Sequence, residues 1–407
     1  MKKLLLILFF LPLIAGATDI YIATTGNDNT GNGSSGSPYA TIQKGVDVAS
    51  PGDNIIVKDG AYSKSSGTFI DLGSGDGGTA GNYVTIKSEH KYGAVLDGQD
   101  NGTTGCDYCF MTGGDVSYIK ILDFEIKNFV TDVMQMAGGT DHPNAYITVQ
   151  GNHIHHIGNI ERSTQYGGIG SYLADANHIT FTQNIFNDLG YYKEGGSNAT
   201  QQGIYLDGCS NISIYYNIFY NFKGGWAIQI YSGSNKPTSD VNIYNNTFAY
   251  SLDATPGHII IAATASGVNI KNNIFYSQYQ KAIRLYDATL TDLVITNNII
   301  GATGILYGED FVTWVNDLVQ ANNRINTDPL MTNPANGDFS LQSNSPAINA
   351  GVDIGLTTDY TNATITDGEP DMGCYEYFAE TPPGDAIIRY KNNGKWVKTT
   401  PKKFVIQ

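Results

Sequence analysis

Four side chains in the middle of the sequence are of the types that move protons on a carboxylate-bearing substrate: Lys193, His156, Tyr205 and Arg162. In a β-elimination, a base removes a proton from carbon, an acid protonates the leaving oxygen, and a cation neutralises the neighbouring carboxylate. Lys193 or His156 is the candidate base, and Tyr205 is the candidate acid. The neutralising cation would be Arg162 or a bound calcium ion.

A second set of side chains suits the binding of a sugar chain. Aromatic rings stack on pyranose rings, while amide, carboxylate and guanidinium groups hydrogen-bond to hydroxyls. The predicted substrate-binding residues are Tyr172, Asp207, Trp226, Gln229, Tyr231 and Arg284. Together with the candidate proton-transfer residues, they predict a groove that takes a polysaccharide.

Short strands must bring these residues together. Five segments have the alternating pattern of a strand: 168–173, 203–208, 227–232, 258–263 and 282–287. Successive side chains of a strand point to opposite faces, so Ile204 points inward and Tyr205 outward. One predicted outward column holds Gly170, Tyr205, Gln229, Ile260 and Arg284. The other holds Tyr172, Asp207, Tyr231, Ala262 and Tyr286.

The longest connections between strands, 155–167 and 187–202, carry the remaining candidates. Long loops on one side of a regular scaffold are common binding sites. Each candidate also has a purely structural interpretation. The histidines within 153–156 can form a hydrogen-bonded turn, and the charges at 193–194 can be a solvated pair. Tyr205 and Tyr231 can stack on one another along a sheet, and Asp207 precedes a glycine, as is common in turns.

An internal repeat is the strongest feature of the sequence. Six segments combine an alternating strand with an Asn and a short apolar run: 146–155, 178–187, 211–220, 241–249, 268–276 and 293–301. The equivalent Asn residues are Asn152, Asn184, Asn217, Asn246, Asn273 and Asn298. A repeat of roughly 25 to 33 residues made of short strands predicts a solenoid. Asn tolerates the left-handed backbone conformation and hydrogen-bonds turn backbone, so we expect a stacked Asn ladder.

This repeat resembles the right-handed parallel β-helix of the pectate-lyase-like superfamily, in which a stacked Asn ladder is a known feature. The opening segment 20–63 is similar to the start of many such proteins, including polysaccharide lyase families six and nine. The segments 328–352 and 370–378 resemble the closing part of secreted bacterial β-helix proteins. The resemblance implies an all-β, right-handed parallel β-helix solenoid and an activity on polysaccharides.

The motifs that would identify one activity do not appear in the sequence. It lacks the dense Asp cluster that holds calcium in family nine and the Lys/Arg region of family six. The paired Asp, Gly-His-Gly and Arg-x-Lys signatures of polygalacturonases are also missing from the repeat. The resemblance in fold and the predicted groove columns motivate the first hypothesis, an exported polysaccharide lyase that cleaves an acidic glycan. The alternatives are a non-catalytic glycan-binding or surface/virion β-helix protein and a glycoside hydrolase on the same fold.

The sequence predicts one β-helix domain over 18–378, with additions at both ends. Residues 39–50 have helical apolar spacing, and we expect them to cap the N-terminal end of the solenoid. Residues 305–377 lack the Asn repeat and should fold over the last coils. Residues 379–384 read as a linker, and 385–407 read as a hairpin-like tail with six Lys/Arg and one Asp, suited to a surface or assembly partner.

Residues 1–17 have the pattern of a signal peptide, which predicts a secreted, periplasmic or cell-surface protein. In an oxidising compartment Cys106 and Cys109 could form a local disulfide, leaving Cys209 and Cys374 as buried thiols. The spacing of the four cysteines does not suit a zinc site, because no second pair of ligands follows Cys106 and Cys109 at the required spacing. The cluster 27–29 fits an Asx-rich turn better than a complete calcium loop.

The net charge of −15 argues against nucleic acid as a partner. Without the signal peptide and the tail, 15 basic residues face 37 acidic ones, so the body carries about −22. No later segment is long and apolar enough to predict a membrane span. A polyanion would therefore need local Lys/Arg or calcium in the groove, unless the glycan is neutral. No other cofactor is expected.

Overall fold

The computed structural model describes residues 16–138, 143–158, 168–190, 201–233, 236–251, 257–262, 264–277, 281–286, 289–301, 321–365 and 368–378, and the strands 388–392 and 395–399. Nearly the whole predicted signal peptide and the predicted linker 379–384 lie outside these residues. None of the helices among the described residues has the length and apolar character needed to cross a membrane.

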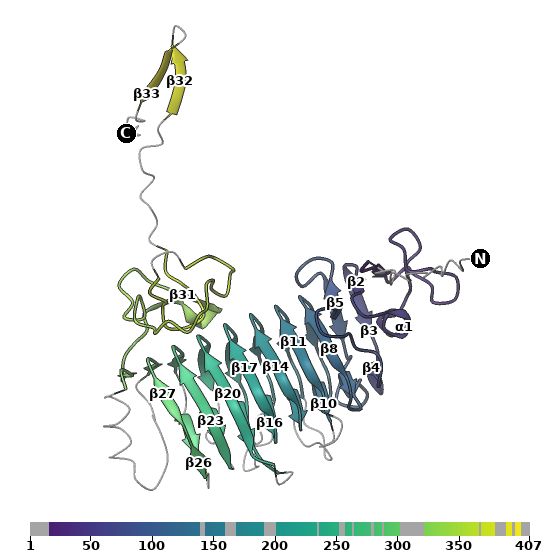
Figure 1. The fold of residues 1–407 in the computed structure, drawn as a ribbon, viewed down its shortest axis with the longest axis horizontal. Helices are drawn as coiled ribbons and strands as arrows, with labels where there is room; N and C mark the ends of the chain where they lie inside the picture. Colours follow the sequence, from purple (N-terminus) through teal and green to yellow (C-terminus); the bar gives the residue numbers. More distant parts are fainter. Residues whose placement is uncertain are drawn as a thin grey trace, which may run out of the picture.

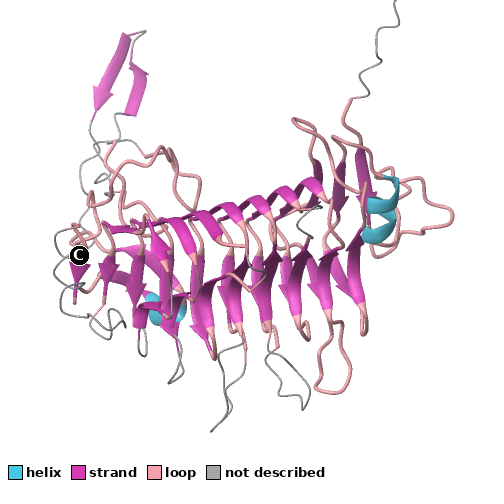
Figure 2. Ribbon diagram, turned by 60° about the horizontal axis from the view of Figure 1, so that its bottom comes forward, coloured by secondary structure: helices cyan, strands magenta, loops and turns pink. Residues whose placement is uncertain are grey.

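The chain winds into a solenoid built from three parallel sheets, which confirms the predicted parallel β-helix (Figures 1 and 2). Sheet 1 contains β1 (Asp19–Ile22), β2 (Asn54–Val57), β5 (Val84–Ser88), β8 (Ser117–Leu122), β11 (Ala145–Gln150), β14 (Asn177–Thr182), β17 (Ser210–Tyr215), β20 (Thr238–Tyr244), β23 (Ala265–Lys271), β26 (Leu290–Thr291) and β27 (Val294–Thr296). Sheet 2 contains β3 (Gly60–Ser63), β6 (Ala94–Asp97), β9 (Glu125–Lys127), β12 (His153–His155), β15 (Ile185–Asn187), β18 (Ile218–Phe222), β21 (Thr247–Ser251), β24 (Ile274–Tyr276), β28 (Ile299–Ile300) and β29 (Arg324–Ile325). Sheet 3 contains β4 (Thr68–Leu72), β7 (Tyr108–Thr112), β10 (Asp132–Ala137), β13 (Ile169–Ala174), β16 (Gln202–Asp207), β19 (Trp226–Tyr231), β22 (Gly257–Ile261) and β25 (Lys281–Leu285).

The predicted capping helix is present as α1 (Ile42–Val48), at the end of the solenoid where the chain enters (Figure 2). Thr41 caps its N-terminus, because its hydroxyl accepts a hydrogen bond from the backbone N–H of Lys44 at 3.2 Å. Gly45 lets the helix lie close to the first coils. A Cβ at this position would come within 2.9 Å of the side chains of Ile22 and Ile55.

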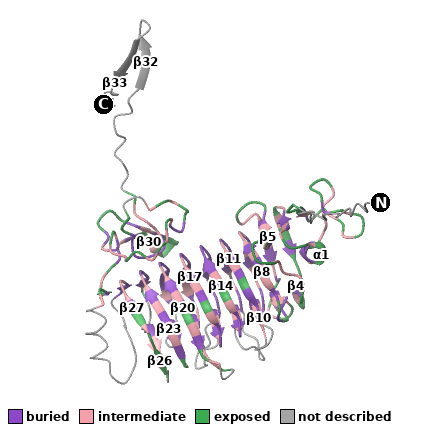
Figure 3. Ribbon diagram, viewed as in Figure 1, coloured by how far each residue is buried: buried purple, intermediate pink, exposed green. Residues whose placement is uncertain are grey.

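Stacked apolar side chains fill the solenoid, so that buried residues alternate with partly exposed ones along the strands (Figure 3). Sheet 2 contributes an inner row of rings at one position in four successive coils: Phe186, Phe219, Phe248 and Phe275. Neighbouring ring centres lie 4.9 to 5.0 Å apart and the rings are within 9° of parallel. Each ring is therefore covered by the coils on both sides, which a single coil could not achieve.

The predicted Asn ladder connects the turns between sheets 1 and 2. Each side-chain N–H₂ donates to the Oδ1 of the next Asn at 2.9 to 3.1 Å. The ladder runs through Asn152, Asn184, Asn217, Asn246, Asn273, Asn298 and Asn323. Asn323 extends it by one coil, so the prediction that the repeat ends before residue 305 is wrong.

The left-handed backbone conformation lies one residue earlier than predicted. The residues before the ladder positions have φ between 48° and 70°: Gly151, Gln183, Tyr216, Asn245, Asn272, Asn297 and Asn322. The ladder residues themselves have no positive φ. Each ladder Asn side chain instead turns into the solenoid and bonds the carbonyl oxygens of a neighbouring coil, as Asn246 does with Ile214 at 2.9 Å.

The C-terminal part of the solenoid domain is held by side chains of these left-handed residues. Gln183 donates to the carbonyl oxygen of Tyr360 at 3.0 Å, and Asn245 donates to that of Asp371 at 2.9 Å. Asn272 exchanges two hydrogen bonds with the backbone of Val352, at 2.8 and 2.9 Å. The parts of the closing segment around Val352, Tyr360 and Asp371 therefore lie along the edge formed by these turns, beside β20 and β23 in Figure 1.

This closing segment also explains why the outer face of sheet 2 changes character along the solenoid. The outward position holds Glu125 and His153 in two early coils and Ile185, Ile218 and Ile274 in later ones. The later positions pack with a second apolar cluster from the closing segment, which includes Met331, Phe339, Leu341, Ala347, Met372 and Cys374. The segment contains β30 (Met331–Asn333), the 3-10 helix η1 (Pro334–Asn336) and β31 (Asp338–Leu341).

Two further features concern the cysteines and the tail. All four cysteines are free and buried, so the predicted Cys106–Cys109 disulfide is not formed. Cys109 lies in β7 with its side chain in the core, while the Cys106 thiol donates to the carbonyl oxygen of Gly67 at 2.8 Å.

In the tail, β32 (Ile388–Asn392) pairs antiparallel with β33 (Lys395–Thr399), and Asn392 is the register partner of Lys395.

Candidate functional site

The outer face of sheet 3 holds most of the residues predicted to bind substrate, but the register of one coil differs from the prediction. Tyr172 is the register partner of Tyr205, and Ala174 is that of Asp207. Gly170 does not belong to the outward column, because a Cβ there would meet the ring of Phe186 at 3.0 Å. The true row, in successive coils, is Gln135, Tyr172, Tyr205, Gln229, Ile260 and Arg284.

Three tyrosines meet at the centre of this face. The ring centre of Tyr205 lies 5.3 Å from that of Tyr172 and 6.0 Å from that of Tyr231. Burial, assisted by the carboxylate of Asp207 and the neighbouring phenols, raises the pKa of Tyr205 far above its ordinary value. Its hydroxyl is therefore protonated at neutral pH and can donate a hydrogen bond, although the raised pKa makes it a weaker acid than an ordinary tyrosine.

Two polar residues beside the tyrosines are fixed by hydrogen bonds. Gln202 donates to the Oε1 of Gln229 at 2.8 Å, which orients the Gln229 amide within its row. The carboxylate of Asp207 accepts from the backbone N–H of Gly233 at 2.6 Å. Asp207 therefore holds the chain that follows β19, in addition to facing outward.

The remaining predicted binding residues lie farther from the tyrosines or are covered. Trp226 is only 3% exposed, so its ring does not form an open rim to the groove. Arg284 lies three coils from Tyr205 in the same row, about 14 Å away at the usual strand spacing. Its guanidinium carbon lies 4.8 Å from the centre of the exposed ring of Tyr286.

His156 follows β12 in the connection from sheet 2 to sheet 3, with a φ of 56°. Its Nδ1 lies 2.6 Å from the Nδ1 of His155, so the two imidazoles share a hydrogen bond. The Nε2 of His155 lies 3.4 Å from Glu125, and the Nε2 of His153 lies 2.7 Å from the Oδ1 of Asn187. The histidines therefore do form the hydrogen-bonded turn that was the structural interpretation.

Burial and the two neighbouring histidines lower the pKa of His155 to about 4, although Glu125 opposes this shift. Burial also lowers the pKa of His153. The imidazoles of His153 and His155 are therefore neutral at pH 7. Lys223, which directly follows β18, lies 3.8 Å from Asp188 in an ion pair. Lys193, Glu194 and Arg162 lie outside the described residues.

Asp132 is a titratable group of this sheet that the sequence reasoning missed. It begins β10, is the register partner of Ile169, and is 8% exposed. Burial raises the pKa of Asp132 to about 7. A hydrogen bond from the backbone of Ile169 lowers the pKa, but this effect is smaller than that of burial. A carboxyl with this pKa can take up or release a proton near neutral pH. The strand 132–137 lies before the clear repeats, and its alternating pattern is the signal that could have revealed it.

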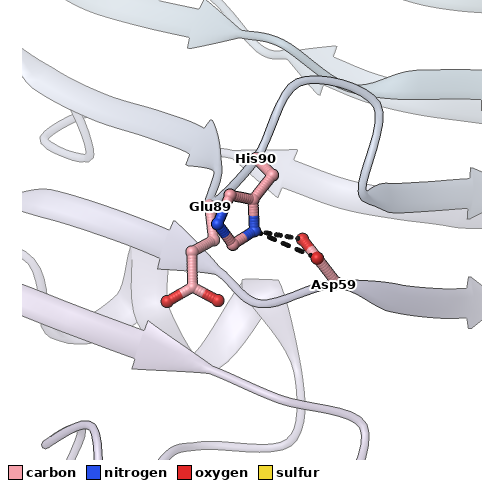
Figure 4. Close-up of side chains that lie close together, drawn as sticks. All are labelled: Asp59, Glu89 and His90. Carbon is pink, nitrogen blue, oxygen red and sulfur yellow. Dashed lines mark hydrogen bonds and ion pairs between the residues drawn. The ribbon is translucent and has the colours of Figure 1, made fainter.

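Among the described residues, no group of three possible metal ligands gathers on sheet 3. The one group of three possible metal ligands among the described residues is Asp59, Glu89 and His90, whose ligand atoms lie within 4.8 Å of one another. These side chains are exposed in the turns between sheets 1 and 2, and Nδ1 of His90 bonds the Asp59 carboxylate at 3.0 and 3.1 Å (Figure 4). The cluster 27–29 forms the expected Asx turn, with Asn27 accepting from two backbone N–H groups.

Comparison with known families and structures agrees with the fold. Residues 196–362 match the family model of a right handed beta helix region, and residues 24–72 match a protein family of unknown function, DUF1565. No protein of curated function matches the chain in sequence. The predicted right-handed parallel β-helix fold is confirmed.

Solved structures give distant similarities. The chain resembles the complex of XylC with xylose at 12% identity and a TM-score of 0.48, over 70% of this chain and 66% of that chain. It resembles the pectate lyase Pel9A at 16% identity and a TM-score of 0.44, over 89% and 97%. It resembles a glycoside hydrolase at 9% identity and a TM-score of 0.48, over 81% and 99%. At these identities the similarity concerns the fold alone.

Proposed function

We propose that this chain is an exported carbohydrate-active protein that binds an acidic glycan along the outer face of sheet 3 and cleaves it by β-elimination. The observation that carries this proposal is the contact of Tyr172, Tyr205 and Tyr231 on one outward face, with Gln229 next in the row. Such a face offers rings for stacking and amide and hydroxyl groups for hydrogen bonds. It also includes a phenol that stays protonated.

The chemistry assigns one task to each group. A base, Lys193 or His156, takes the proton from C5 of a uronate, and the electron pair of that bond forms the C4–C5 double bond. The bond from C4 to the glycosidic oxygen breaks, and Tyr205 donates the proton that this oxygen gains. Arg162 neutralises the uronate carboxylate, which makes the C5 proton easier to remove. No step is assigned to calcium, because the described residues of this face do not gather carboxylates around one point.

A glycoside hydrolase on the same face is supported less well. Hydrolysis of this kind uses two carboxyl groups about 5 to 10 Å apart. Asp207 lies on the outer face, whereas Asp132, whose pKa is raised, is buried at the start of β10. Their register puts them five residues and two coils apart, about 19 Å between Cα atoms. That separation is too large for one glycosidic bond.

Incubation with alginate, pectate, chondroitin and similar polymers, with and without calcium, tests the proposal. A lyase produces chains with an unsaturated end, which raises the ultraviolet absorbance. Substitution of Tyr205, and of the one of Lys193 and His156 that is the base, should remove the absorbance increase while binding to the same polymer is kept. If no polymer gives unsaturated ends under either condition, the lyase proposal fails, and a reducing-end assay then decides whether hydrolysis occurs.

The non-catalytic alternative rests on the tail. Residues 385–407 are basic, in contrast to the acidic body, and their two strands pair as a hairpin. A surface or assembly protein would use this tail for attachment. Deletion of 385–407 should then abolish retention at the cell surface and leave glycan binding intact. Unchanged retention would contradict the attachment role.

A further inference from the structure

The outer face of sheet 1 carries a groove that the proposed lyase reaction does not use. Its cavity volume is about 330 Å³. It is lined by Tyr83, Tyr146, Thr148, His178, Thr180, Asn211, Ser213 and Asn242. No Asp, Glu, Lys or Arg lines it, so its chemistry consists of hydroxyl, amide and aromatic groups. Sheet 1 is a different side of the solenoid from sheet 3 (Figure 2).

Polar side chains form a regular row along the floor of this groove. Thr148, Thr180, Ser213 and Asn242 are register partners in four successive strands, β11, β14, β17 and β20. Strands of a sheet are about 4.8 Å apart, so the row presents four polar groups over about 14 Å along the solenoid axis. A ligand that meets all four must itself carry hydrogen-bonding groups at regular intervals, as the hydroxyls of a glycan chain do.

Aromatic rings form a second row beside the polar one. The ring of Tyr146 stacks on Tyr118 at 4.7 Å between ring centres, with an angle of 1°, and on His178 at 4.5 Å, with an angle of 22°. Tyr83 closes the row with an edge contact to Tyr118 at 5.5 Å. Tyr146 is nevertheless 37% exposed, so the stack leaves ring edges and hydroxyls at the wall of the groove.

The backbone under these rings is strained. Tyr118, Tyr146 and His178 have φ values of 60°, 55° and 54°, in the left-handed region that bulky side chains avoid. The same position in the next coils holds Asn211 and Asp240, which adopt this conformation more readily. Tyr92, Tyr216 and Tyr250 adopt the same conformation away from this groove, so the backbone alone does not mark a site. What distinguishes this row is that its rings stack on one another beside the polar row.

We propose that this groove binds a neutral glycan chain lying along the solenoid axis, with its hydroxyls on the polar row and a sugar face against the aromatic row. Lys120 continues the polar row one strand before Thr148, and its Nζ lies 4.9 Å from the centre of the Tyr83 ring. The lining itself has no cationic side chain, and the net charge of the body, about −22, disfavours an acidic glycan here. This binding is independent of the reaction proposed for sheet 3, and it would hold the protein on a polymer while sheet 3 acts elsewhere.

Affinity electrophoresis tests this inference with gels that contain hydroxyethyl cellulose, mixed-linkage β-glucan or galactomannan, and with alginate as the acidic comparison. Wild type should be retarded by at least one neutral polymer. Tyr146→Asn, which keeps a residue suited to the left-handed backbone, and Thr180→Val, which removes one hydroxyl, should each weaken the retardation, about tenfold for Tyr146→Asn. Tyr205→Phe on sheet 3 is the matched control and should be retarded like wild type.

Two results would overturn the inference. One is that none of the three neutral polymers retards wild type. The other is that both Tyr146→Asn and Thr180→Val, with thermal unfolding curves like that of wild type, are retarded as strongly as wild type. If Tyr205→Phe abolishes the retardation while both groove variants are retarded like wild type, the neutral glycan binds to sheet 3 instead. The lyase assay with acidic polymers is read separately, so failure of one proposal does not decide the other.

Discussion

Substitution of one residue of the Asn ladder should destabilise the whole solenoid far more than its size suggests. In Asn246→Ala the protein loses five side-chain hydrogen bonds, all in the interior. The Asn246 amide donates to Ile214, Tyr244 and Asn273 at 2.9 to 3.1 Å. Its Oδ1 accepts from the backbone N–H and the side chain of Asn217 at 2.8 and 3.0 Å.

The size of the loss in unfolding free energy depends on which hydrogen bonds the partners of Asn246 keep in the variant. The backbone N–H of Asn217 is buried and loses its acceptor, which costs about 2 kcal/mol. The carbonyl oxygens of Ile214 and Tyr244 each lose a donor, at about 1 kcal/mol each. Asn273 keeps the hydrogen bond from the backbone N–H of residue 246 at 2.9 Å. The total is about 4 kcal/mol in the free energy of unfolding.

Urea unfolding followed by far-ultraviolet circular dichroism measures this difference. Asn242→Ala is the matched control, because it changes the same residue type in the same coil on the partly exposed face. Its Oδ1 accepts from the Tyr244 hydroxyl and from Asn269, and both donors can turn to water. We expect a loss of less than about 1 kcal/mol for Asn242→Ala. If the two variants unfold within that margin of each other, the ladder does not stabilise the fold in the way described.

Three further predictions concern the titration of sheet 3, its chemistry and the closing segment. Burial raises the pKa of Asp132 to about 7, so the folded protein holds this proton more tightly than the unfolded chain. This contribution to the free energy of unfolding is fully present below about pH 4. It is lost as the pH rises through about 7, and the loss reaches about 4 kcal/mol. Relative to Asp132→Asn, wild type should therefore lose stability between those pH values in urea unfolding, and a constant difference would refute the assignment. Tyr205→Phe should lower turnover of the acidic glycan by about a hundredfold or more, while binding of the glycan changes little. Tyr231→Phe is the control and should keep most of the turnover. Equal effects of the two substitutions in a steady-state assay would count against Tyr205 as the acid. Asn272→Gly keeps the left-handed backbone but removes both hydrogen bonds to Val352. Hydrogen exchange of the Val352 amide should therefore become about tenfold faster or more. An unchanged exchange rate would show that other contacts hold the closing segment.

The sequence predicts the architecture well because the ladder residues repeat once per coil and are followed by an apolar run. Asn184 and Asn217, for example, occupy the same place in consecutive coils, and their buried amides have few alternatives to bonding each other. Sheet 3 is harder to predict. Its register depends on Leu173 facing Leu206, while the similar Gly-Ile pairs at 168–169 and 203–204 suggest an alignment shifted by two residues.

Other parts of the candidate site depend on contacts that a single strand pattern does not contain. The burial that raises the pKa of Asp132 comes from neighbouring coils, and its strand precedes the clear repeats. Trp226 looks like an exposed binding residue in sequence, but it is covered in the fold. Gln183 and Asn272 hold a segment of the chain that lies 80 or more residues away in the sequence, which local periodicity cannot reveal.

The most direct test of the central claim is a crystal structure with an acidic oligosaccharide bound, using a fragment of a polymer that the protein cleaves. The account predicts electron density for the sugar chain on the outer face of sheet 3, with rings against Tyr172 and Tyr205 and a hydroxyl on Gln229. Density on another face, with the tyrosine face empty at the same oligosaccharide concentration, would contradict it.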